Sequence, residues 1–143
     1  MSLLDTPKRL LSIAETVHRW AGALAAMDRT RRAKVARYAE AIAETLGRAA
    51  RHAVRLAAAP ADKAAHRGLT REFGRISGYL ETLVGVLQHH LDGRKLAGVK
   101  RRLEQLGPRG ALAGPEAPAA KIRVDRLLAA EGYFRALADA LRA

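Results

Sequence analysis

The stretch LTREFGRISGYLETLVGVLQHHL, residues 69–91, decides the fold class of this chain. Its large apolar side chains recur at steps of three or four positions: Leu69, Phe73, Ile76, Leu80, Leu83, Leu87 and Leu91. A step of about 3.5 residues places all of them on one side of an α-helix and suits packing in a helical bundle. Polar side chains fill the positions between, so the pattern predicts an amphipathic helix with one face in a core.

The rest of the chain repeats this pattern between recognisable helix boundaries. Asp28 and Asp62 are good N-caps, while Pro60 and the pair Gly107-Pro108 end helices. We expect helices at about 7–27, 28–58, 62–91, 94–106 and 119–141, with a Gly/Pro/Ala-rich loop at 107–118. The prediction is a single all-α domain over residues 1–143, an antiparallel up-and-down bundle of four main helices plus one shorter helix.

Composition excludes several classes of protein. The chain has no cysteine, which rules out disulfides and thiolate-bound metals. Its first residues lack the basic and apolar regions of a secretory signal, and no window approaches the ~18 apolar residues of a membrane span. We therefore expect a cytoplasmic protein, with peripheral contact at the inner face of a membrane as the alternative location.

The chain is strongly basic, with 26 Lys and Arg against 14 Asp and Glu and a formal net charge of +12. Such a surplus favours anionic partners: an acidic protein, acidic lipid or nucleic acid. A GC-rich genome also produces an arginine- and alanine-rich composition, because its codon bias enriches these residues at surface positions that tolerate substitution. Both interpretations of the charge stay open from sequence alone.

Three basic clusters are the candidate anion-binding residues. The first is the start of the second helix, with Arg29, Arg31, Arg32 and Lys34; the second is a row at steps of four, with Lys63, Arg67, Arg71 and Arg75; the third holds Lys100, Arg101 and Arg102. Each cluster predicts phosphate or carboxylate contacts, and a solvated helix face is the alternative for each. No aromatic residues are expected to interleave with them to stack bases, which weighs against nucleic acid.

Three glycines mark a candidate helix interface. Gly74, Gly78 and Gly85 share the side of their helix opposite the leucine stripe, and each costs roughly 1 kcal/mol against alanine. A second helix passing close, from the same chain or another copy, would explain them. Tolerated substitution on an exposed face is the alternative.

The sequence contains few residue patterns that indicate catalysis or metal binding. Glu15 and His18 form half of the E-x-x-H pair of di-iron bundles, but no other glutamate has a histidine three positions later. No nucleophile elbow and no glycine-rich phosphate loop is present. We expect no catalytic residues, no metal, no cofactor and no small-molecule substrate, and hence a protein that is not an enzyme.

Two segments carry a resemblance. RRAKVARYAEAIAETLGRAA (31–50) and AEGYFRALADALRA (130–143) resemble parts of small helical domains in bacterial signalling and effector proteins. More loosely, the order of helices is similar to that of the HeLo-like four-helix cell-death domains. That resemblance implies a basic bundle that binds anionic lipid headgroups and permeabilises membranes.

The functional prediction is a non-enzymatic interaction module of a bacterial signalling or effector system. It would use helix faces and basic patches to bind an anionic protein partner, or associate with itself. A membrane-targeting cell-death bundle on acidic lipid is the first alternative, and nonspecific nucleic-acid binding is the second.

Overall fold

The predicted fold class is confirmed: the protein is an all-α helical bundle. A computed structural model describes residues 6–88, 97, 101 and 123–142. Within them the helices are α1 (Thr6–Arg19), α2 (Ala21–Ala25), α3 (Arg29–Ala58), α4 (Lys63–Leu87) and α7 (Val124–Arg142). None of the helices in these ranges is both long and apolar enough to cross a membrane.

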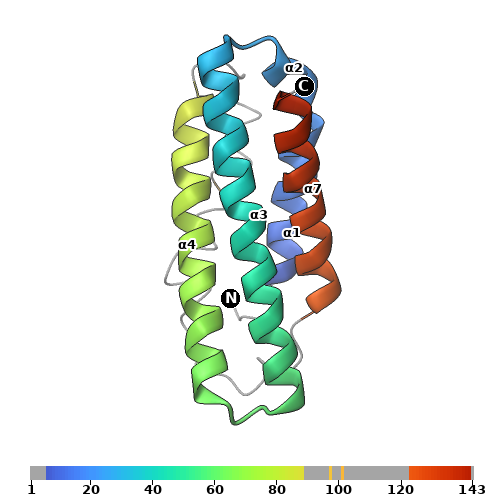
Figure 1. The fold of residues 1–143 in the computed structure, drawn as a ribbon, viewed down its shortest axis with the longest axis vertical. Coiled ribbons are helices and arrows are strands. Elements are labelled where there is room, and N and C mark those ends of the chain that lie inside the picture. The colour runs from blue at the N-terminus through green and yellow to red at the C-terminus, as the bar shows by residue number, and fades with distance from the viewer. Residues whose placement is uncertain (1–5, 89–96, 98–100, 102–122, 143) are drawn as a thin grey trace.

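The longest helix, α3, is the centre of the arrangement. It packs against α4 on one side and α7 on the other, and α7 in turn packs against α1. Figure 1 shows that α1, α3 and α4 alternate in direction, as an up-and-down bundle requires. The last helix, α7, runs antiparallel to α3 and parallel to α1, so the C-terminal end of α7 lies beside the start of α3.

The two aspartates predicted as N-caps are confirmed in that role. Asp28 accepts a hydrogen bond from the backbone N–H of Arg31 at 2.9 Å, and Asp62 accepts one from the backbone N–H of Ala65, also at 2.9 Å. Each bond satisfies one of the N–H groups that the first turn of a helix leaves without a partner. The starts of α3 and α4 are therefore fixed by local chemistry.

The helix predicted at 7–27 is wrong in its continuity, because the chain breaks at Trp20 into α1 and α2. Trp20 has φ −85° and ψ 1°, the sparsely populated bridge conformation, and its backbone N–H donates to the carbonyl of Val17 at 3.0 Å. This tighter turn lets the indole ring, only 7 % exposed, reach the core. Leu24 and Met27 are buried beyond the break.

The other predicted boundaries are met only in part. The helix predicted at 62–91 is described as far as Leu87, followed by Gln88 as its C-cap. The predicted helix at 94–106 and the loop at 107–118 lie outside the described residues, except that Ala97 and Arg101 are helical. The last helix was expected from about 119, but Arg123 is not helical and α7 begins at Val124.

The predicted apolar stripes form the core. Leu69, Phe73, Ile76, Leu80, Leu83 and Leu87 of α4 are all at most 1 % exposed, as are Leu127, Phe134 and Leu137 of α7. The small residues Ala39, Ala43 and Ala49 are equally buried on α3, which allows its neighbours on both sides to approach closely. Tyr38, also on α3, is only partly buried.

Candidate functional site

The four residues of the first basic cluster do not form a single patch, because they lie in three different places around the start of α3. Arg31 pairs with the carboxylate of its own cap, Asp28, at 3.5 Å. Arg29 and Arg32 line one pocket, and Lys34 lines another. Successive residues on a helix point about 100° apart, so this separation follows from the spacing alone.

The pocket beside Arg29 and Arg32 contains a third arginine that the sequence did not indicate. This arginine pocket, of about 490 Å³, is lined by Arg29, Arg32, Ala33, Leu141 and Arg142, and thus joins the start of α3 to the end of α7. Within the described part of the chain, the buried Nε of Arg32 has no hydrogen-bond partner. Arg142 donates to the carboxylate of Glu40, and this bond with its positive charge lowers the pKa of Glu40.

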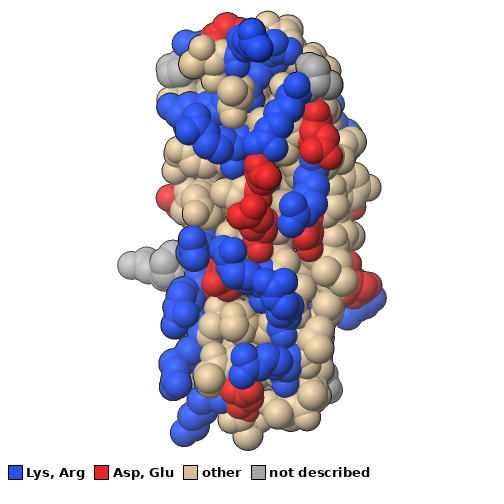
Figure 2. All heavy atoms as spheres, viewed as in Figure 1, with Lys and Arg blue, Asp and Glu red and all other residues tan. Residues whose placement is uncertain are grey.

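The second basic cluster is a continuous row on α4. Lys63, Arg67, Arg71 and Arg75 are all exposed. Arg75 donates to the hydroxyl of Tyr79 at 3.4 Å, whereas no ion pair within the described ranges involves Lys63, Arg67 or Arg71. Figure 2 shows Lys and Arg side chains gathered over α3 and α4, with carboxylates only in small groups between them.

The third cluster cannot be placed as a group. Lys100 and Arg102 lie outside the described residues, and Arg101 is helical and exposed. The prediction of an anion site there stays a prediction.

The glycines predicted at a helix interface are exposed. A Cβ added to Gly74, Gly78 or Gly85 would meet no described atom within 4 Å, so no described helix of the same chain packs on this face. Contact with the helix predicted at 94–106, most of which lies outside the described residues, or with a second copy stays a prediction. Gly68 instead faces α3 closely, because a Cβ there would collide with the ring of His52.

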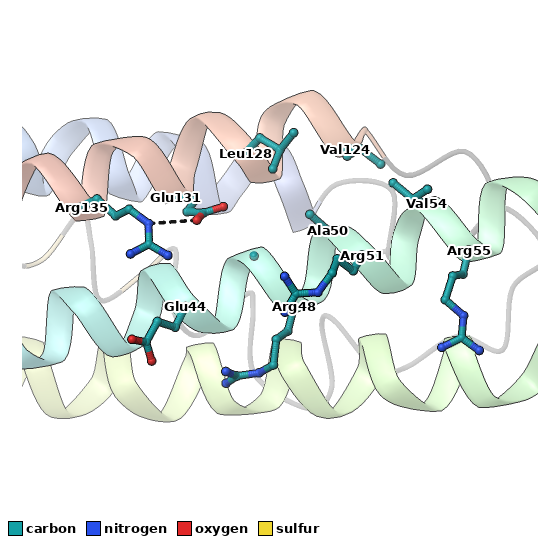
Figure 3. Close-up of a pocket in the computed structure, with 11 residues that line it drawn as sticks. Glu44, Arg48, Ala50, Arg51, Val54, Arg55, Val124, Leu128, Glu131 and Arg135 are labelled. Atoms are coloured by element: carbon teal, nitrogen blue, oxygen red, sulfur yellow. Dashed lines mark hydrogen bonds and ion pairs between the residues drawn. The ribbon is translucent and has the colours of Figure 1, made fainter.

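A groove lies between α3 and α7. Its volume is about 660 Å³, and its apolar lining includes Ala50, Val54, Val124 and Leu128. Val54 is 54 % exposed and Leu128 52 %; the only other large hydrophobic residue exposed in the described part is Tyr133. Figure 3 shows Val54 on α3 near Leu128 and Val124 on α7. This α3–α7 groove is an apolar surface that the fold leaves open.

Charged side chains surround the apolar part of the groove. Arg48 reaches Glu72 of α4 at 3.1 Å, and Arg55 reaches Asp62 at 3.3 Å. Arg135 reaches Glu131 at 2.9 Å, as Figure 3 shows. Arg51 is exposed and has no ion pair with any described residue. The lining holds four arginines against two glutamates, Glu44 and Glu131, and Arg51 is its only arginine without an ion pair to a described residue.

A smaller hollow between α3 and α4 corrects the expectation that no aromatic residues lie among the cations. This tyrosine hollow, of about 230 Å³, is lined by Lys34, Arg37, Tyr38, Ala41 and Tyr79. The rings of Tyr38 and Tyr79 have centroids 6.4 Å apart and planes at 53°. The two tyrosines are far apart in sequence, and only helix packing brings them together.

The three histidines that the structure describes, His18, His52 and His66, do not form a cluster. His18 packs edge-on against Tyr133, with ring centroids 5.4 Å apart. His52 and His66 each keep one buried ring nitrogen without a hydrogen-bond partner among the described residues. Across residues 6–88, 97, 101 and 123–142, no group of three or more His, Asp or Glu is placed to hold a metal ion.

The groove residues left a weak signal in the sequence. Val54 is an aliphatic residue between Arg51 and Arg55 on the polar side of its helix, and Leu128 lies beside the stripe residue Leu127. An aliphatic side chain outside the stripe is often incidental. Only the packing of α7 on α3 shows that the two belong to one surface.

Comparison of the chain with protein-family models, with curated proteins and with solved structures found no match.

Proposed function

We propose that the protein is a non-enzymatic interaction module that binds an acidic, amphipathic helix of a protein partner in the α3–α7 groove. One observation carries the proposal: Val54 and Leu128, exposed aliphatic side chains from two helices, lie in one groove with an arginine-rich rim. Helix-in-groove recognition needs this combination, an apolar strip for anchor residues and charges beside it for orientation.

The size of the groove suits a short helix. Its lining on α3 extends from Glu44 to Arg55, which is about 16 Å of helix axis or three turns. A partner helix of that length offers two or three apolar anchors at i, i+3 or i+4, and i+7. Val54 and Leu128 would contact these anchors.

The charge of the rim favours an acidic partner over a second copy of this chain. Arg48, Arg55 and Arg135 already have carboxylate partners, so Arg51 is the cation free to bind a carboxylate of the incoming helix. A second copy would bring the same surplus, +12 per chain, and like charges facing each other oppose association. The proposal is made for a bacterial protein of the cytoplasm, with peripheral contact at the inner face of the membrane as the alternative location.

The test uses a defined acidic peptide. A helix-stabilised peptide of about 15 residues, with leucines at i, i+3, i+4 and i+7 and glutamates beside them, is titrated against the labelled protein by fluorescence anisotropy. We expect saturable binding that Val54→Glu or Leu128→Glu weakens about tenfold or more. Arg51→Glu should weaken it as well and lower its salt dependence.

The matched control is Tyr133→Glu, which removes the other exposed large hydrophobic side chain at a position outside the groove lining. This variant should bind the peptide as the parent protein does. A peptide with every glutamate replaced by lysine should not bind. No binding of the acidic peptide, or equal loss in the control, would contradict the proposal. Binding only to anionic vesicles would favour the membrane-targeting alternative instead.

A further inference from the structure

The tyrosine hollow between α3 and α4 combines aromatic rings with exposed cations. Tyr38 and Tyr79 are both partly buried, so the bundle holds their rings in place while part of each faces the hollow. Lys34 and Arg37, also in its lining, are exposed and form no ion pair with any residue that the structure describes. Among the residues that the structure describes, no acidic side chain lines the hollow.

Positive charge continues from the hollow along α4. Arg75 bonds to the hydroxyl of Tyr79, and Arg71, Arg67 and Lys63 follow at steps of four residues, about 6 Å each along the helix axis. That step is similar to the phosphate spacing of an extended single strand of nucleic acid. The cations follow the inclined i, i+4 ridge of α4 from its seam with α3 onto its outer surface. The hollow and this row form one basic path with two tyrosines at its end.

The stability of the fold does not explain this row of cations on α4. Four cations at i, i+4 steps repel one another by a few tenths of a kcal/mol per pair, and no ion pair among the described residues involves Lys63, Arg67 or Arg71. A polyanion laid along the row would remove that repulsion and release its own counterions.

We propose that the α3–α4 seam binds single-stranded nucleic acid. One base packs against Tyr38 and Tyr79, and the adjoining phosphates contact Lys34 and Arg37 and then the cation row of α4. Unpaired bases stack on aromatic side chains with little regard to sequence, and a positive groove follows the backbone. A duplex keeps its bases stacked inside and cannot place one in the hollow. Acidic lipid could neutralise the cations, but it offers no planar ring to rest on the tyrosines.

This site is separate from the proposed peptide groove, which lies between α3 and α7 and shares no lining residue with the hollow. Either proposal can therefore fail alone. Leu128→Glu should leave nucleic-acid binding within about twofold of the parent protein, while variants of the hollow should leave peptide binding unchanged.

The experiment measures anisotropy of fluorescein-labelled oligo(dT) and oligo(U) of about 15 nucleotides at several salt concentrations. We expect Tyr38→Leu and Tyr79→Leu to weaken binding about five- to a hundredfold each, since they remove a stacking ring but keep an apolar side chain. Tyr133→Leu is the matched control and should bind normally. Lys34→Gln with Arg37→Gln should weaken binding and flatten its salt dependence, whereas Lys8→Gln with Arg19→Gln should do so less.

A second measurement uses only the parent protein, so its result does not depend on variants that could unfold. In the parent protein, NMR ring-proton signals of Tyr38 and Tyr79 should shift upfield on adding the oligonucleotide, as stacked bases cause, while those of Tyr133 stay fixed. Absence of binding at low salt would overturn the proposal. So would equal binding by the tyrosine variants, or duplex DNA binding as tightly as the single strand, since both indicate charge alone. Binding to anionic vesicles but not to oligonucleotides would overturn it in favour of lipid.

Discussion

Arg48 of α3 and Glu72 of α4 form a partly buried ion pair across the helix interface. The Nε of Arg48 donates to Oε2 of Glu72 at 3.1 Å, and a terminal nitrogen of the same guanidinium donates to the hydroxyl of Thr45, also at 3.1 Å. The side chain of Glu72 is only 6 % exposed, against 35 % for Arg48. The carboxylate therefore depends on the arginine far more than the arginine depends on it.

This asymmetry predicts unequal effects of substitution. Arg48→Met leaves a buried carboxylate with its ion-pair partner removed and should lower the free energy of unfolding by about 1–3 kcal/mol. The double variant Arg48→Met/Glu72→Met removes both charges and should regain most of that loss. Urea unfolding of the two variants and the parent protein measures these differences in unfolding free energy. A double variant no more stable than Arg48→Met would contradict this account.

The contact between Gly68 and His52 predicts a steric effect that a second substitution relieves. Gly68→Ala should destabilise the bundle by about 1–3 kcal/mol, because the new methyl group collides with the His52 ring. In a His52→Ala background the same change should cost little or become favourable, since alanine is the better helix former. Gly74→Ala, in open space, is the matched control and should stabilise α4 slightly. The melting temperatures of these variants form the test.

The packing of α7 on α3 predicts different effects of two neighbouring aromatics. Phe134 is 1 % exposed and Tyr133 is 37 % exposed. Phe134→Ala should cost about 3–5 kcal/mol of unfolding free energy, through lost burial and the cavity left behind. Tyr133→Ala should cost less than about 1 kcal/mol. Similar losses in both variants by denaturant unfolding would show that α7 is not docked as described.

The N-cap of α4 predicts a dependence of stability on pH. The hydrogen bond from the backbone N–H of Ala65, with Arg55 nearby, lowers the pKa of Asp62 below its ordinary value. A carboxyl whose folded pKa is lowered adds stability at neutral pH, and this is lost as pH falls below about 4 toward the folded value. Asp62→Asn keeps a capping oxygen but cannot titrate, so its melting temperature should fall less between pH 5 and pH 3 than that of the parent protein. Equal slopes would contradict the assignment.

The basic start of α3 predicts that two arginines contribute nothing to stability. Arg29 and Arg32 lie in the first turn, where the partial positive charge of the helix terminus disfavours cations. Arg29→Gln with Arg32→Gln should leave helicity unchanged and melting unchanged or slightly higher. Arg31 is left in place because it pairs with Asp28. A clear loss of melting temperature, followed by circular dichroism, would mean that these arginines are structural.

Much of the fold could be predicted because its determinants are local. The caps at Asp28 and Asp62 and the stripe from Leu69 to Leu87 depend on residues within a few positions of each other. The break at Trp20 could not be foreseen, because apolar residues at helical spacing, Val17, Ala21 and Leu24, continue through it. Only the packing of the core decides where the indole lies. Gly68 was passed over for Gly74 for the same reason: nothing near Gly68 in sequence shows that the ring of His52 lies against it.

The sequence by itself determined that this chain forms amphipathic helices, where α3 and α4 begin, and that the surface is strongly basic. These properties follow from period, capping and composition, which act over a few residues. Only the tertiary structure decided which side chains share a site: Arg142 and Arg32 line one pocket, Tyr38 and Tyr79 another, and Val54 and Leu128 the α3–α7 groove. Each pair comes from different helices, and its placement depends on the rotation and register of one helix against another. That geometry is set by the packing of the whole core, which no local pattern encodes.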